Sequence, residues 1–274
     1  MAVTGAMGVV VAGAAGRMGC EVVRTVLAQP DMALVGAADV ARVGEDAGLV
    51  AGVASCGVAI ASQVQEALAS SGARVLVDFT RADVAVGNVL SAVAAGVACV
   101  VGTTGLDAGH LERIARAAEN RGVGVLVAPN FALGAVLMMR FASEAARYYE
   151  WAEIIERHHE KKLDAPSGTA LRTAELMAAE RRATGGGFQQ VAGEIEKLAS
   201  ARGAEFQGIR IHSVRSPGLL AHQEVVLGGP GETLTIRHDS TARTSFMPGV
   251  MLAIRRIRDV RGLLVGLEHL LTPA

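Results

Sequence analysis

The sequence predicts an α/β protein with a doubly wound parallel sheet, followed by a second α+β domain that carries a mixed or antiparallel sheet. Two observations lead to this prediction. Apolar strand runs alternate with Ala-rich helical runs over the first half, and strand runs with few helical interruptions dominate after Asn130. The length of 274 residues and the 51% hydrophobic content suffice for one large domain or two modest ones.

The first half alternates short β-rich segments with helical segments. Uncharged strands between helices indicate a parallel sheet that is covered on both faces, and right-handed crossovers make it doubly wound. The expected strands are 8–12, 32–38, 74–80, 97–102 and 123–128, and the expected helices are 17–29, 82–95 and 107–121.

The second half has short connections between strands, which favour an antiparallel or mixed sheet. The expected helices are 132–149 and 168–183, the expected strands are 151–159, 208–216, 221–229 and 232–240, and a mobile loop is expected at 184–190. Two C-terminal segments, 247–257 and 262–271, look helical, and we expect them to return to the first domain. The predicted domains are therefore 1–130 plus 245–274, and 131–244.

Net charge and aromatic content argue against a nucleic-acid partner. The formal net charge is −1 at neutral pH and 3% of the residues are aromatic. Proteins that bind nucleic acids usually combine a basic balance with aromatic side chains on which bases stack. We therefore expect no nucleic-acid partner.

The cysteines and the N-terminal segment predict a cytoplasmic protein. Cys20, Cys56 and Cys99 are scattered, with no CxxC pair, which is typical of reduced thiols and not of a zinc site or a disulfide framework. The first basic residue is Arg17, so the positive region of a signal peptide is lacking.

One uncharged segment, 84–106, has the length of a membrane span, which needs about 20 apolar residues. It contains Asn88, Ser91 and the polar turn GTTG, and Gly96 divides it into a helix-like half and a strand-like half. We therefore predict a buried helix and strand there, and no membrane partner.

A glycine turn between the first strand and the first helix predicts a dinucleotide site. Gly13 permits a tight turn, Gly16 lets the backbone approach a pyrophosphate, and Gly19 lets the helix pack closely on the sheet. The helix N-terminus offers free N–H groups to phosphates. Asp39 follows the second strand, about 20 residues after Gly19, where an acid binds the ribose of NAD(H). Plain glycine usage in a Gly-rich chain is the alternative explanation, but the flanking elements and Asp39 favour a Rossmann-like site.

The cofactor is expected to be NADH, NADPH or both. Asp39 favours the free ribose hydroxyls of NADH, while Arg17 and Arg42 are near enough in sequence to reach a 2′-phosphate. Two later turns, GTTG at 102–105 and APNF at 128–131, follow strands on the same sheet edge. They are therefore expected near the nicotinamide half, unless they are ordinary strand-to-helix turns.

The segment ERHHEKKLDAPSGTAL gathers polar residues at the exit of the 151–159 strand. His158 and His159 point to opposite sides because side chains alternate along a strand. A histidine can donate or accept a proton, and Lys162 can hold a carboxylate or protonate a nitrogen. Ser167-Gly168-Thr169 opens a helix whose free N–H groups suit a carboxylate.

Ordinary explanations exist for each part of this segment. A histidine pair can bind a metal, but no HExxH-like spacing or Cys partner is present, so we expect no metal. Lys161 and Lys162 can be a solvated patch, and a Ser-Gly-Thr turn is usually a helix N-cap. The density of these features within a short segment favours a site.

The chain resembles the 4-hydroxy-tetrahydrodipicolinate reductase (dihydrodipicolinate reductase) family of the diaminopimelate and lysine pathway. The matching segments run in order over nearly the whole chain: VAGAAGRMG, DFT, VGTTG, APNFALGAVLM, ERHHEKKLDAPSGTAL and HDSTARTSF. The HH-x-x-K-x-DAPSGTA element is far more specific than the glycine turn.

The resemblance implies roles for individual residues and an assembly. It implies that His158 donates or accepts a proton, that Lys162 is a second proton donor, and that Asp39 holds the adenosine ribose. It places the pyrophosphate at Gly13, Ala14, Ala15, Gly16, Arg17 and Met18, the nicotinamide side at Gly102, Thr103, Thr104, Ala128, Pro129, Asn130 and Phe131, and the substrate carboxylates at His159, Gly168 and Thr169. It also implies that the second-domain sheet assembles a homotetramer.

The reaction implied by the resemblance is reduction of a cyclic conjugated imine dicarboxylate, with hydride transfer to the ring and protonation of the resulting enamine. From Asp39 the sequence is DVAR with a short loop, where many family members have an Arg after the acid and a longer loop, so the choice between NADH and NADPH stays open. Two rival functions are another two-domain dehydrogenase, acting on a semialdehyde or a sugar, and a dinucleotide-sensing protein without catalysis. A semialdehyde dehydrogenase needs a cysteine nucleophile, and none of the three cysteines has a convincing context for that role.

Overall fold

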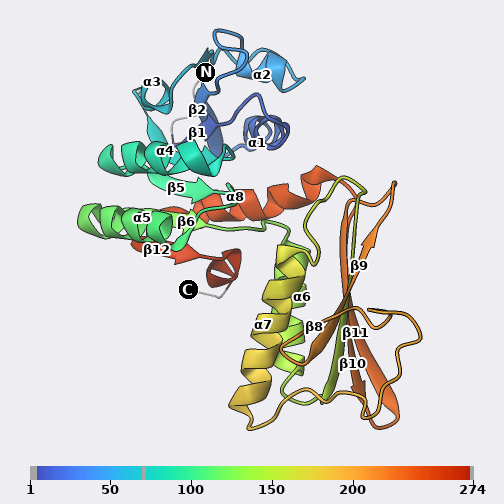
Figure 1. Ribbon diagram of the computed structural model, residues 1–274. Coiled ribbons are helices and arrows are strands. Elements are labelled where there is room, and N and C mark those ends of the chain that lie inside the picture. The colour runs from blue at the N-terminus through green and yellow to red at the C-terminus, as the bar shows by residue number, and fades with distance from the viewer. Residues whose placement is uncertain (1–4, 70–71, 272–274) are drawn as a thin grey trace. The chain divides into compact units, whose positions relative to one another are not determined.

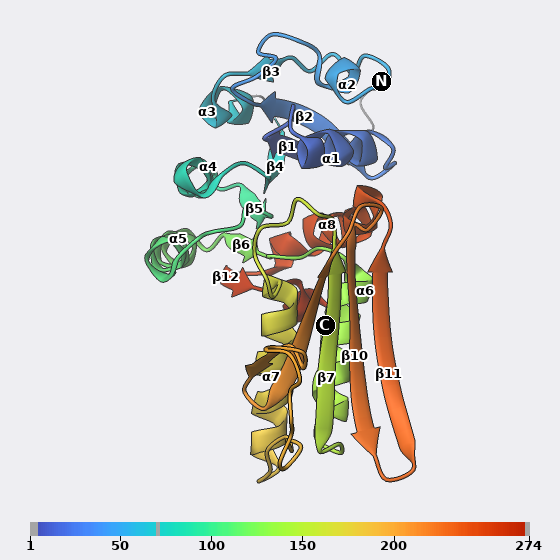
Figure 2. The same cartoon turned by 45° about the vertical axis from the view of Figure 1, so that its right-hand side comes forward.

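The computed structural model describes residues 5–69 and 72–271. The chain divides into two compact units, Met1–Phe131 with Phe246–Ala274, and Ala132–Ser245. Each unit has its own sheet, and each is described by itself below (Figures 1 and 2).

The first unit is built on a seven-stranded sheet in the order β12-β6-β5-β4-β1-β2-β3, in which all paired strands are parallel. The central strands are almost entirely buried, as expected for a sheet with helices on both faces. The strands are β1 (Met7–Ala12), β2 (Met32–Ala38), β3 (Ile60–Ala61), β4 (Ala73–Asp78), β5 (Ala98–Val101), β6 (Gly124–Val127) and β12 (Gly262–Val265).

Helices cover both faces of this sheet. Figure 1 shows α4 and α5 on one side and α1 and α8 on the other; α3 contacts α4, α4 contacts α5, and α1 contacts α8. The helices are α1 (Arg17–Leu27), α2 (Ala47–Val50), α3 (Val64–Leu68), α4 (Ala82–Ala94), α5 (Ala108–Arg121) and α8 (Met247–Arg256), with short 3-10 helices η2 (Ile257–Asp259) and η3 (Leu267–Leu270). The predicted doubly wound α/β fold is confirmed.

The C-terminal segment differs from its prediction. Residues 262–271 were expected to be helical, but Gly262–Val265 forms β12, which pairs in parallel with β6 and extends the sheet. Gly262 and Gly266 have positive φ angles of 77° and 106°, which end regular structure on either side of a short apolar run. Pairing with β6 therefore overrides the helix propensity of the leucines. The short elements β3, α2 and α3 were not predicted.

The uncharged segment 84–106 forms α4 and β5, as predicted, and Gly96 separates them with a φ of 75°. Among the described residues, no helix is long and apolar enough to cross a bilayer.

The second unit has a five-stranded mixed sheet in the order β11-β10-β7-β9-β8. β10 and β11 form an antiparallel hairpin, β10 is antiparallel to β7, and β9 is parallel to β7. The elements are α6 (Leu133–Ala145), β7 (Trp151–His158), α7 (Gly168–Ala183), β8 (Ala204–Phe206), β9 (Ile209–Arg215), β10 (Ala221–Gly229), β11 (Glu232–Ser240) and the 3-10 helix η1 (Arg243–Phe246) at the unit boundary.

Most elements of this unit lie where they were predicted, and α7, β10 and β11 match to the residue. α6 ends at Ala145, earlier than the predicted end at 149, and β8 was not predicted. The predicted loop 184–190 contains no helix or strand.

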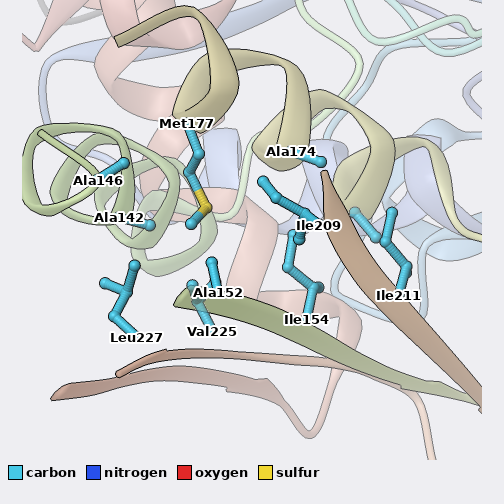
Figure 3. Packing of buried hydrophobic residues seen from close by; sticks show 11 residues of the cluster. Ala142, Ala146, Ala152, Ile154, Ala174, Met177, Ile209, Ile211, Val225 and Leu227 are labelled. Atoms are coloured by element: carbon cyan, nitrogen blue, oxygen red, sulfur yellow. The ribbon is translucent and has the colours of Figure 1, made fainter. Parts of the chain in front are cut away.

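The core of the second unit lies between the sheet and the helices α6 and α7. Met177 extends from α7 toward the strands, beside Ala142 of α6 and Ile209 of β9 (Figure 3). Ile154 on β7 belongs to the same buried cluster. Side chains that alternate with the core residues along β7 therefore point to the opposite face of the sheet.

Candidate functional site

The glycine turn after β1 has the close packing that a phosphate-binding turn needs. Gly13 has a φ of 77°, and a Cβ added there would lie 2.8 Å from the carbonyl oxygen of Phe79. A Cβ at Gly19 would lie 1.9 Å from the carbonyl oxygen of Gly13. Any side chain at Gly19 would therefore push α1 away from the turn. The first turn of α1 carries no acidic residue, so its N-terminus stays attractive to anions.

Asp39 is tied to this turn by a direct hydrogen bond. The backbone N–H of Ala15 donates to Oδ2 of Asp39 at 3.0 Å, and the backbone N–H of Ala41 donates to Oδ1 at 2.9 Å. These hydrogen bonds join the carboxylate at the end of β2 to the turn at the end of β1. The remaining lone pairs of the Asp39 carboxylate can accept hydrogen bonds from hydroxyl groups.

A pocket of about 470 Å³ lies along this edge of the first unit. Its lining includes Gly13, Gly16, Asp39, Phe79, Thr80 and Arg81. Other members of the predicted pyrophosphate segment are not part of the lining, since Ala14 is buried and the Arg17 side chain is exposed. Arg81, which was not predicted, forms an exposed ion pair with Asp83 at 2.8 Å.

Asp78 accepts four hydrogen bonds and was not among the predicted site residues. It is fully buried at the end of β4, and its carboxylate accepts hydrogen bonds from Thr80 N, Thr80 Oγ1, Asn88 Nδ2 and Thr103 Oγ1 at 2.6–2.9 Å. Thr103 was predicted at the nicotinamide side, but its hydroxyl group donates to the Asp78 carboxylate. The sequence did contain a signal for this role, because Asp78 is a single carboxylate in the apolar run before Phe79.

The turns after β5 and β6 meet around an aromatic pair. A Cβ at Gly102 would lie 2.1 Å from the ring of Phe79, and the rings of Phe79 and Phe131 have centroids 5.7 Å apart. The backbone N–H of Ala128 donates to Val101 O at 2.9 Å. Phe131 is buried among these groups, whereas Thr104 and Pro129 are exposed and Asn130 is half-buried. The predicted residues of both turns therefore gather at one sheet edge.

In the second unit, Glu156 lies at the centre of the polar segment and was also missed. Its side chain is fully buried, and Oε2 lies 2.5 Å from Nδ1 of His158. The backbone N–H of Ser167 donates to Oε1 at 3.2 Å. An acid two positions before a histidine in a strand shares its face, which was the sequence indication.

Arg215, at the end of β9, uses all five donors of its guanidinium here. Nη1 and Nη2 donate to the two carboxylate oxygens of Glu156, each at 2.8 Å. The other bonds go to the carbonyl oxygens of Val214 at 2.8 Å, Asp164 at 2.6 Å and Lys162 at 3.3 Å. One side chain thus joins the buried carboxylate to the turn after β7.

These contacts set the charge of the carboxylate. Burial alone would raise the pKa of Glu156, but hydrogen bonds from His158 and Arg215 outweigh it and lower the pKa to about 2. Glu156 is therefore an anion at neutral pH. Oppositely, Glu156 raises the pKa of Arg215 above its ordinary value, so the pair stays charged.

The remaining predicted residues surround the entrance of α7. Lys162 Nζ lies 2.8 Å from both carboxylate oxygens of Asp164, and this hydrogen bond lowers the pKa of Asp164. Ser167 is the N-cap of α7, with Oγ accepting from Ala170 N at 3.2 Å. Gly168 is exposed, and the first turn of α7 has no acidic residue, so this N-terminus can receive an anion. His159 and Thr169 are half-buried.

The predicted residues fall into two sets, one in each unit. All predicted cofactor residues belong to the first unit, and His158, His159, Lys162, Gly168 and Thr169 belong to the second. Within the residues that the structure describes, no group of three His, Cys, Asp or Glu side chains is arranged to hold a metal ion.

Comparisons with known proteins cover nearly the whole chain. Residues 7–131 match the family model described as dihydrodipicolinate reductase, N-terminus, and residues 134–271 match the model for its C-terminus. A 4-hydroxy-tetrahydrodipicolinate reductase of Moorella thermoacetica is 52% identical over 96% of this chain and 97% of its own length. One of Desulfitobacterium hafniense is 48% identical over 96% of this chain and 98% of its own length. The solved structure of a dipicolinate-bound dihydrodipicolinate reductase from Paenisporosarcina sp. TG-14 has a TM-score of 0.86 and 40% identity, covering 97% of this chain and all of that one.

Proposed function

This chain belongs to the dihydrodipicolinate reductase family, and we propose that His158, backed by Glu156, is the proton donor of its reaction. The function is the NAD(P)H-dependent reduction of 4-hydroxy-tetrahydrodipicolinate to tetrahydrodipicolinate, a step of lysine and diaminopimelate biosynthesis. The observation that carries the proposed role is the 2.5 Å contact between His158 and a fully buried carboxylate.

The residues of the first unit fit a dinucleotide. The tight turn at Gly13 and Gly16, the start of α1 without acidic residues and the nearby carboxylate of Asp39 match a pyrophosphate followed by a ribose. We assign the pyrophosphate to the backbone of 13–18 and the adenosine ribose to Asp39. The turns 102–104 and 128–131 form the nicotinamide side. A bound reduced nicotinamide supplies the hydride.

The balance of charges around Asp39 favours NADH over NADPH. A 2′-phosphate would meet the Asp39 carboxylate. Arg42, three residues later in the chain, and Arg81, which lines the same pocket, both have acidic partners. Arg42 pairs with Glu45 at 2.8 Å, and Arg81 pairs with Asp83 at 2.8 Å. Both pairs are exposed and therefore weak, so NADPH is used with a higher KM and not rejected. Comparison of kcat/KM for the two cofactors tests this, and a preference for NADPH contradicts it.

The residues of the second unit fit a dicarboxylate. The N-terminus of α7 at Gly168 and Thr169 receives one carboxylate, and His159 and Lys162 add positive charge. After water has left the substrate, hydride reaches the conjugated ring and an enamine is formed. His158 then transfers its Nε2 proton to the enamine carbon. Its Nδ1–H stays bonded to Glu156, so the ring keeps its orientation while its charge changes.

The second-unit sheet is proposed as the assembly surface of a homotetramer. The face opposite α6 and α7 presents the half-buried Ile155 and Val226. It also carries ion pairs, Arg157 with Glu224 at 3.3 Å and His222 with Asp239 at 2.7 Å. Apolar side chains among paired charges suit contact with a second copy of the same surface. We also propose a cytoplasmic location, which rests on three cysteines that form no disulfide.

One variant tests the proton-donor role. We expect His158→Gln to lower kcat about 10²- to 10⁴-fold, while the Kd of NADH changes less than about twofold. The assay is NADH oxidation with enzymatically generated hydroxy-tetrahydrodipicolinate, together with cofactor titration by fluorescence. Equal loss of turnover and NADH binding would contradict the role. Cofactor binding by the wild type without any turnover would instead support a sensing protein.

Neighbouring lysines give a matched test of the carboxylate site. Lys162 is largely buried and paired with Asp164, whereas Lys161 is exposed. We expect Lys162→Met to raise the KM for the substrate about tenfold or more and Lys161→Met to change it less than about twofold. Equal effects of the two substitutions would mean that the two lysines act only through their positive charge and that Lys162 makes no specific contact with the substrate.

A further inference from the structure

A partly buried ion pair between Glu156 and Arg215 contacts His158 and has no direct role in hydride or proton transfer. We propose that Glu156 and Arg215 are a positioning pair, which fixes the tautomer of His158 and holds the Lys162 turn against it. The inference rests on the proposed role of His158. It adds two residues that the reaction itself does not require to touch the substrate.

Glu156 decides which nitrogen of His158 carries the proton in the neutral ring. As an anion, Glu156 can only accept hydrogen bonds, so the nitrogen at 2.5 Å must be Nδ1–H. Nε2 is then the nitrogen that gains and loses the catalytic proton. If the tautomer were reversed, two lone pairs would face each other in a fully buried place, which is unfavourable.

Arg215 links this carboxylate to Lys162 through the backbone. The guanidinium binds both oxygens of Glu156 and also the carbonyl oxygens of Lys162 and Asp164. These are the two residues whose side chains form the neighbouring ion pair. A planar group with five fixed donors can hold these partners at once, and an ammonium group cannot.

The charged groups around His158 come from several elements. Glu156 lies on its own strand and Arg215 on β9. The following turn adds Lys162 and Asp164, and β10 places the uncharged Ala221 opposite. At the start of α7, residues 168–171 are uncharged. Glu156 is thus the acid in direct contact with the ring.

A second cluster that includes a residue of β7 has the same residue types on the other face of the sheet. Glu153 contacts His212 at 2.7 Å and also pairs with Arg202. It has the same three residue types as Glu156, His158 and Arg215. Because Glu153 alternates with the core residues Ala152 and Ile154, it points to the opposite face of the sheet. It is therefore a matched control.

The first experiment uses the unmodified enzyme. Nitrogen-15 NMR of histidine-labelled protein distinguishes the two neutral tautomers, and His158→Gln identifies the resonance. We expect the neutral ring of His158 to be in the Nδ1–H form. A predominant Nε2–H form would overturn the inference, whatever happens to the variants.

The second experiment compares Glu156→Gln with Glu153→Gln. An amide can donate or accept, so Glu156→Gln releases the tautomer and removes the negative charge. We expect kcat to fall about tenfold or more and the substrate KM to change less than about threefold. Glu153→Gln is expected to change kcat less than about twofold. Equal effects of the two variants on kcat and on the substrate KM would overturn the inference.

The third comparison separates the two halves of the proposal. Arg215→Lys keeps the charge but loses the bonds to the turn, so we expect the substrate KM to rise about fivefold or more, in addition to a lower kcat. An unchanged KM would refute the link to Lys162. Failure of the underlying function is distinguishable, because His158→Gln would then leave kcat intact. Failure of this inference leaves the His158→Gln loss in place and makes Glu156→Gln harmless.

Discussion

Thr103 donates a hydrogen bond to the buried carboxylate of Asp78 at 2.9 Å, which joins the turn after β5 to the end of β4. We expect Thr103→Val to reduce the free energy of unfolding by about 1–2 kcal/mol, because Asp78 loses one donor where water cannot replace it. Denaturant titration measures this. Thr104→Val changes an exposed neighbour and is the control, with an expected effect within about 0.5 kcal/mol. Equal losses for the two variants would refute the structural role of Thr103.

Two glycines at helical positions should respond oppositely to alanine. At Gly19 a Cβ would lie 1.9 Å from a carbonyl oxygen, so Gly19→Ala is expected to cost about 1–3 kcal/mol and to weaken NADH binding. At Gly87, within α4, nothing lies within 4 Å of the new Cβ, so Gly87→Ala is expected to stabilise by about 0.5–1 kcal/mol. Thermal unfolding and cofactor titration give both values. A tolerated Gly19→Ala would mean that α1 can move outward without losing the site.

Acid should weaken the fold through Glu156. Its pKa is lowered from 4.5 to about 2, since burial is outweighed by hydrogen bonds from His158 and Arg215. A lowered folded pKa gives stability that is complete above the unfolded value and is lost as the pH falls from about 5 to 2. In Glu156→Gln, the loss of unfolding free energy on acidification should be smaller by on the order of 2 kcal/mol.

Only part of the acid sensitivity belongs to Glu156. The pKa of Asp46 is also lowered, since hydrogen bonds from the backbone N–H groups of Leu49 and Cys56 outweigh the effect of burial. Urea titrations between pH 7 and pH 3 on wild type and Glu156→Gln make the comparison. If the unfolding free energy of the two proteins depends equally on pH, the contacts of the Glu156 carboxylate do not stabilise the fold.

The sheet face of the second unit contains a natural reporter of assembly. Trp151 is the one tryptophan of the chain and is 39% exposed. If this face assembles the tetramer, Val226→Asp should dissociate it and move the Trp151 emission to longer wavelength. Sedimentation velocity gives the mass. Leu49→Asp, at an exposed apolar residue of α2 in the first unit, is the control and should leave mass and emission unchanged. A tetramer that survives Val226→Asp would place the interface elsewhere.

The sequence predicted the repeating parts of the fold because they depend on local patterns. Strand and helix periodicity located α4, α7, β10 and β11, and the glycine spacing located the turn between β1 and α1. It did not predict β12, because three apolar residues between Gly262 and Gly266 suit a helix as well as a strand. The choice was made by the free edge of β6, which lies far away in the sequence.

The same division holds for the candidate site. The sequence by itself predicted His158, Lys162, the start of α7 and Asp39 as site residues, since these lie in dense local motifs next to element ends. Only the tertiary structure decided that Thr103 donates to Asp78 and that Arg215 binds Glu156, because those partners come from segments far apart in the sequence. The cost of burying a carboxylate without donors demands such partners, but it does not say where along the chain they are found.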